Sequence, residues 1–104
     1  MSAHLLLTTA PNRTQARRLA QALLKKRLAA CVHIFAPGES IYWWKGKLEK
    51  TREVTLLLKT TKKALPSLIR HLKEIHPYQT PEILALRVEK GHPAYLDWIK
   101  QETF

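Results

Sequence analysis

The chain has very little of the residue types on which several common function classes depend. Among its 104 residues there are one cysteine, three glycines and a single aspartate, Asp97. A lone cysteine cannot form an intrachain disulfide, which excludes a disulfide-stapled secreted scaffold. Isolated glycines exclude the phosphate-binding loops of P-loop and dinucleotide sites, and one aspartate leaves little support for a Ser-His-Asp or Cys-His-Asp triad. We therefore predict no catalytic residues.

Long apolar runs are also missing. No stretch approaches the roughly 18 residues of a membrane-spanning helix, and the N-terminus lacks the basic and apolar segments of a signal peptide. At 104 residues the chain has the length of one domain, which we assign to residues 1–104. We expect a soluble, cytoplasmic protein that has no membrane partner.

The charge is predominantly of one sign. Eighteen lysines and arginines against eight acidic residues give a formal net charge of +10. These cations are spread along the chain and never form the block of about five or six like charges that marks an interaction tail. A solvated basic surface is therefore favoured over an interaction with nucleic acid or an anionic membrane, to which such a charge would also be suited.

The order of the predicted elements indicates an α+β fold. Periodicity, turn residues and a good helix N-cap at Asn12 predict alternating strands and helices. Strands are expected at residues 4–9, 30–35, 40–45 and 83–88, and a further long strand follows a turn at Gly46 and ends at residues 54–58. Helices are expected at about 13–28, from Thr60–Lys63 onward with Pro66 in the first turn, and around Tyr95–Ile99. This is the ferredoxin-like βαββαβ order with a C-terminal helix and a long hairpin arm. Right-handed crossovers should place both main helices on one face of the sheet.

An RNA-recognition domain shares this order of elements. Such domains stack bases on aromatic side chains of the first and third strands. Here the first strand carries Leu5, Leu6 and Leu7, and residues 54–58 also lack aromatic rings. We therefore disfavour nucleic acid as a partner.

The predicted hairpin arm is aromatic on both faces. Because successive strand residues face opposite sides, Trp43 points away from Tyr42 and Trp44. Tyr95 and Trp98 add further aromatic surface in the C-terminal segment. Either the arm folds back over its own core, or it packs on a neighbouring subunit, which is the usual meaning of such an exposed patch. We favour an oligomer with these five residues at its interface.

Cys31, His33 and His76 are the candidate metal ligands. Cys31 and His33 lie two apart on a predicted strand, and a thiolate beside an imidazole suits Cu(I) or Zn(II). The pair supplies only two ligands, and Cys31 could equally be a core thiol. His76 precedes Pro77 and either satisfies the carbonyls at a helix C-terminus or contacts a ligand. Both interpretations remain open for each residue.

Five segments of the chain resemble the CutA divalent-cation-tolerance proteins. They follow one another in order from about Leu5 to Ile99 and include Arg27–Val32, Ile41–Glu49, Leu58–Thr60, His76–Tyr78 with Pro81–Ile83, and Tyr95–Ile99. The resemblance implies a ferredoxin-like protomer in a homotrimer, with the arm reaching onto neighbours. It also implies an architecture similar to the PII signalling proteins, which bind small ligands between subunits, a role in tolerance of copper and other divalent cations, and no enzymatic reaction.

The chain departs from the CutA pattern at positions that bear on copper. Where some members have a cysteine and a His pair, this chain has Thr8 and Ile75–His76, so only His76 carries over. Gln79 replaces a frequent acidic residue, and His33 a frequent asparagine. We predict a non-enzymatic CutA-like trimer in the response to divalent metal ions, with no required cofactor and with weak binding of copper or another divalent cation. The alternatives are a PII-like sensor of a small anionic ligand and a basic nucleic-acid-binding domain.

Overall fold

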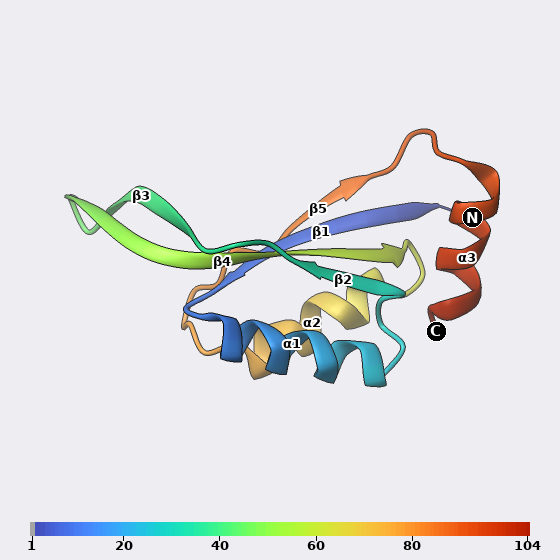
Figure 1. Cartoon of the computed structure of the whole chain (residues 1–104), viewed down its shortest axis with the longest axis horizontal. Coiled ribbons are helices and arrows are strands. Elements are labelled where there is room, and N and C mark those ends of the chain that lie inside the picture. Colours follow the sequence, from blue (N-terminus) through green and yellow to red (C-terminus); the bar gives the residue numbers. More distant parts are fainter. Residues whose placement is uncertain (1) are drawn as a thin grey trace.

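The structure, a computed structural model, describes residues 2–104, so Met1 of the predicted domain lies outside the described residues. Its elements are, in chain order, β1 (Ala3–Ala10), α1 (Arg13–Lys25), β2 (Cys31–Ile34), β3 (Gly38–Trp44), β4 (Lys47–Thr61), α2 (Leu65–Ile75), β5 (Leu84–Arg87) and α3 (Pro93–Glu102). The strands form an antiparallel sheet in the order β2-β4-β1-β5, with β3 paired to β4 beyond that path. Helices α1 and α2 lie together on one face of the sheet (Figure 1). The predicted α+β ferredoxin-like fold is confirmed.

Local sequence signals account for both ends of α1. The Asn12 side chain accepts a hydrogen bond from the Gln15 amide at 2.8 Å, as expected of an N-cap. The helix ends at Lys25, earlier than predicted, because Arg27 adopts a left-handed conformation with φ of 57°. The Leu28 amide then donates to the Leu23 carbonyl at 3.1 Å, which closes the last turn in the manner of a Schellman motif.

The predicted start of α2 is wrong by several residues. Thr60 and Thr61 belong to β4, where they pair with His4 and Ala3 of β1, so they do not open the helix. Thr61 instead accepts a hydrogen bond from the Ala64 amide at 3.2 Å through its hydroxyl, just before α2 begins. Pro66 falls in the first turn, as predicted. Sheet pairing with β1 therefore overrides the local tendency of these threonines to start a helix.

A leucine core fills the space between the sheet and the two helices. Leu6, Leu56 and Leu58 project from the sheet and Leu19 and Leu68 from the helices, all without solvent exposure. The opposite face of the sheet is also apolar but lacks a comparable cover. On that open face Leu5, Leu7 and Leu57 are half-buried, and Leu84 and Leu86 of β5 are 57% and 49% exposed.

The arm is formed by β3 and the first half of β4. It extends from the body of the molecule, whose longest dimension is 44 Å (Figure 1). Lys45 and Gly46 both have positive φ, which is the conformation that a two-residue hairpin turn requires, and the predicted turn at Gly46 is confirmed. Trp43 near the tip is 72% exposed. The arm therefore does not fold back over the core of its own chain.

Candidate functional site

A cavity of about 570 Å³ lies at the base of the arm. Three parts of the chain form it: the end of β1, the two strands of the arm, and the connector between α2 and β5. Its lining residues are Thr9, Ser40, Tyr42, Trp44, Glu53, Pro77, Tyr78, Gln79, Thr80 and Glu82. Pro77 and Pro81 keep the connector out of helical conformation, which holds Tyr78 against the sheet.

Glu53 accepts two side-chain hydrogen bonds in this cavity. Its Oε2 atom accepts from Tyr78 Oη at 2.9 Å and from Thr9 Oγ1 at 3.2 Å. Glu53 has no cationic partner, because the only ion pair among residues 2–104 joins Arg27 to Glu102. Burial, together with the hydrogen bond to Glu53, raises the pKa of Tyr78, so the phenol stays protonated and remains a donor. The cavity thus holds an uncompensated, half-buried carboxylate in a fixed position.

His76 lies behind the cavity wall and links β1 to the connector. Its Nδ1 atom accepts from the Tyr78 amide at 3.0 Å, and its Nε2 atom lies 2.7 Å from the Thr9 carbonyl. Because an amide can only donate, Nδ1 is unprotonated and Nε2 carries the proton. Burial, reinforced by the nearby charge of Arg18, lowers the pKa of His76, which agrees with a neutral ring.

This geometry gives His76 a positioning role toward Tyr78. The His76 ring bonds the Thr9 carbonyl of β1 and not a carbonyl at the end of α2. The Ile75 carbonyl at the end of α2 accepts instead from Arg18 at 2.8 Å. Both ring nitrogens are engaged. A metal ion could bind His76 only by displacing one of these two hydrogen bonds.

Cys31 and His33 lie on β2, on the open face of the sheet. They are paired with Lys59 and Leu57 of β4, and the His33 ring packs edge-on against Phe35 with centroids 4.9 Å apart. Among residues 2–104 no three His, Cys, Asp or Glu side chains are grouped so as to hold a metal ion. The three predicted ligands therefore do not form a common site within one protomer, and their metal role stays a prediction.

The predicted interface residues occupy three separate places. Tyr42 and Trp44 line the cavity, and Trp43 projects from the other face of the arm. On α3 the rings of Tyr95 and Trp98 lie against each other with centroids 5.5 Å apart, and Tyr95 accepts a hydrogen bond from Lys59 Nζ at 3.0 Å. All five side chains are exposed in the single chain.

Sequence reasoning missed Glu53, Thr9 and Tyr78 as a group. A weak signal was present, since Glu53 shares a strand face with Thr55 and Leu57, at the start of an otherwise apolar run. The cavity lining contains two carboxylates, Glu53 and Glu82, and none of the eighteen lysines and arginines of the chain. In a protein of net charge +10 this lining favours a cation over an anion.

Comparison with known proteins decides the family. The model of the CutA1 divalent ion tolerance protein family matches residues 4–102. The chain belongs to this family. The divalent-cation tolerance protein CutA of Thermus thermophilus is 45% identical over 97 residues, which are 93% of this chain and 94% of that protein. A crystal structure of CutA from Xylella fastidiosa is 38% identical, covers 100% of both chains and has a TM-score of 0.96.

Some CutA relatives are longer than this chain, and one of them is named for a cellular compartment. A rice relative named chloroplastic is 41% identical over 95 residues, which are 91% of this chain and 54% of that protein. The chain likewise spans about half the length of the mouse and human CutA proteins that it matches. Within residues 2–104 no helix is long and apolar enough to cross a bilayer. The cytoplasmic location of this CutA chain stays a prediction.

Proposed function

We propose that the chain acts as a homotrimeric CutA protein in the response to divalent metal ions. The observation that carries the proposal is the apolar surface that a single chain leaves uncovered, which comprises the arm and the open face of the sheet. Its exposed members include Ile41, Trp43, Trp44, Leu48, Leu84 and Leu86. Exposed apolar area of this extent is typical of a protein interface. The proposal includes no enzymatic step, and we place the protein in the cytoplasm.

The native mass tests the assembly. We expect a species of three protomers, and we expect Trp43→Ser and Leu84→Ser each to shift it toward smaller species, because each removes apolar area from the proposed interface. Phe104→Ser is the matched control, since Phe104 is 66% exposed but lies at the C-terminus, away from the arm and the open face. A monomeric parent chain, or equal behaviour of all three variants, would remove the basis for the trimer.

We place weak binding of copper or another divalent cation at His76, with Cys31 and His33 as further ligands near a subunit interface. Two observations support cation binding near His76. The adjoining cavity carries Glu53 and Glu82 without a neighbouring lysine or arginine in its lining, and the neutral imidazole has the form that metals bind. Binding must compete with the hydrogen bonds of the ring, so the affinity is expected to be low.

Calorimetry with Cu(II) tests this placement. His76→Ala is expected to lower the affinity of the intact protein, and Cys31→Ser or His33→Ala to lower it further if the open face contributes. His92→Ala, which removes an exposed histidine just before α3, is the control and should leave the affinity unchanged. If His76→Ala behaves like the control, His76 is not a ligand.

The acidic lining also bears on the PII-like alternative. A small anionic ligand would meet the Glu53 and Glu82 carboxylates in this cavity, which disfavours its binding there. A thermal-shift screen of nucleotides, carboxylates and divalent cations separates the two functions, because specific binding raises the melting temperature.

A further inference from the structure

We propose that the outer surface of the two-helix layer is a docking surface for the phosphate backbone of a nucleic-acid duplex. We call this surface the helical face. It is formed by α1, α2 and the short loops at their ends. Its exposed cations are Arg13, Arg17, Arg18, Lys25, Lys26, Arg27, Lys62, Lys63, Arg70 and Lys73.

The helical face holds most of the net charge of the protein. These ten cations are accompanied by two acidic residues, Glu74 and Glu102, of which Glu102 pairs with Arg27, so the formal charge there is 10 − 2 = +8. The rest of the chain has 18 − 10 = 8 cations and 8 − 2 = 6 acidic residues, which leaves +2. The two helices are distant in the sequence and lie side by side on the sheet (Figure 1), so folding gathers charges that the sequence spreads out.

The local geometry presents several of these cations without partners. Arg13, Arg17 and Lys25 fall on one row of α1 at spacings of four and eight residues, along a helix roughly 20 Å long. In residues 2–104 none of the three makes a side-chain hydrogen bond or ion pair. Arg18 and Arg27 differ, because Arg18 donates to the Ile75 carbonyl at 2.8 Å and Arg27 pairs with Glu102.

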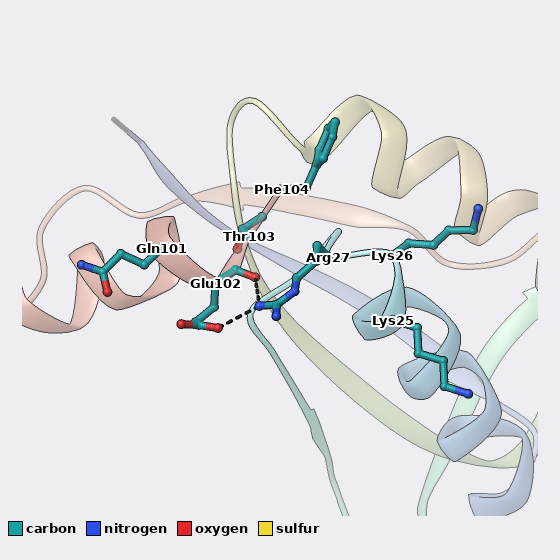
Figure 2. Close-up of a pocket in the computed structure, with 7 residues that line it drawn as sticks. All are labelled: Lys25, Lys26, Arg27, Gln101, Glu102, Thr103 and Phe104. Atoms are coloured by element: carbon teal, nitrogen blue, oxygen red, sulfur yellow. Dashed lines mark hydrogen bonds and ion pairs between the residues drawn. The ribbon is translucent and has the colours of Figure 1, made fainter.

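The C-terminal end of α1 adds two hollows to the helical face. One, of about 460 Å³, lies between Lys25–Arg27 and the C-terminal residues 101–104. Figure 2 shows Arg27 bonded to Glu102, whereas the side chains of Lys25 and Lys26 extend away from that pair. The other hollow, of about 420 Å³, shares Lys26 and is lined by Arg70. Glu102 lines the first hollow and Glu74 the second, so in both hollows the lysines and arginines outnumber the carboxylates.

The chemistry of the helical face favours the backbone of a duplex over other polyanions. The exposed ring of Phe104 borders both hollows, but no large hydrophobic side chain is exposed within α1 or α2 themselves. A helix that inserts into a membrane surface needs such side chains, and single-stranded nucleic acid needs aromatic rings for base stacking. A duplex presents one negative charge per about 1.7 Å of its axis and requires only a complementary row of cations. The helical face lies across the sheet from the open apolar face, so this inference does not depend on the trimer.

Fluorescence anisotropy with a labelled DNA duplex of mixed sequence, about 20 base pairs long, tests the inference. The intact protein is expected to bind it at about 0.1 M salt, with an affinity that falls steeply as salt increases. The triple variant Arg13→Gln, Arg17→Gln, Lys25→Gln should reduce the slope of log K against log salt by about 3 × 0.9, or about 2.7, and should weaken binding at about 0.1 M salt on the order of a hundredfold. Glutamine has nearly the helix propensity of the residues it replaces, so α1 should be retained, which circular dichroism checks.

The matched control is Lys47→Gln, Lys90→Gln, Lys100→Gln. It removes the same three charges from exposed positions outside the helical face and should change the slope by less than about 1. Absence of binding at about 0.1 M salt, or equal losses in both triple variants, would overturn the inference. Selective binding to phosphatidylserine vesicles without binding to the duplex would overturn it as well, and would assign the helical face to a membrane.

Discussion

Removing one hydroxyl from the cavity at the base of the arm probes the arrangement on which the candidate site depends. Tyr78→Phe deletes the donor 2.9 Å from Glu53 and retains the ring that packs against His76. A hydrogen bond to a charged group contributes about 1.5–3 kcal/mol, and both partners here are half-buried. We therefore expect the free energy of unfolding to fall by about 1.5 kcal/mol, which is about tenfold in the unfolding equilibrium constant.

Tyr42→Phe is the matched control within the same cavity. Its hydroxyl also makes one hydrogen bond, to Thr51 at 2.9 Å, but that pair is neutral and exposed. We expect a loss below about 0.5 kcal/mol, because water replaces the lost partner. Urea denaturation of both variants and of the parent protein measures the difference. All three are measured at the same protomer concentration, so that any contribution of subunit association to stability is the same in each. Equal losses in the two variants would refute the reasoning that the Glu53 charge strengthens the Tyr78 bond.

A double-mutant cycle isolates the pair itself. With Glu53→Gln as the second substitution, the coupling energy between Tyr78 and Glu53 should be about 1 kcal/mol, since removing either partner removes the same charged hydrogen bond. Additive effects would mean that Tyr78 stabilises the protein through its packing and not through its hydroxyl.

Further perturbations test His76, the helix cap and the core. Burial lowers the pKa of His76 below 6.5, so the unfolded chain binds more protons than the folded protein between the lowered value and 6.5. Stability should therefore fall as pH drops below 6.5, by up to about 1.4 kcal/mol per pH unit, and urea titrations of His76→Gln across this range should lack that component of the slope. Asn12→Ala should cost about 1 kcal/mol in urea denaturation, with a smaller loss for Asn12→Ser, which can still cap. Leu68→Ala should cost about 2–5 kcal/mol in the same assay at every protein concentration, because Leu68 is fully buried within the protomer. Leu86→Ala, on the open face, should instead lower stability in a concentration-dependent way if the trimer forms there.

Short-range chemistry explains why much of the fold could be predicted. The Asn12 cap, the Gly46 turn and Pro66 in the first turn of α2 each depend on residues a few positions away, so the sequence pattern contains the whole interaction. The start of α2 was mispredicted because its deciding contact is remote. Thr60 and Thr61 are kept in β4 by pairing with His4 and Ala3 of the first strand.

The candidate site and the helical face depend on contacts between distant segments. Thr9 and Tyr78 converge on Glu53 from positions 44 and 25 residues away, and no local pattern encodes that meeting. The cations of the helical face were visible in the sequence, but only the packing of α1 beside α2 puts them on one surface.

The sequence by itself determined the order of the elements and the apolar surplus of the arm, because these follow from composition, periodicity and local turn and cap chemistry, and its resemblance to the CutA proteins indicated the family. The tertiary structure alone decided that Glu53 lies without a cationic partner in a cavity that has no lysine or arginine in its lining, and that +8 of the +10 charge lies on one side of the sheet. The physical reason is that charges interact through space, and only the fold sets the distances between residues that are far apart along the chain.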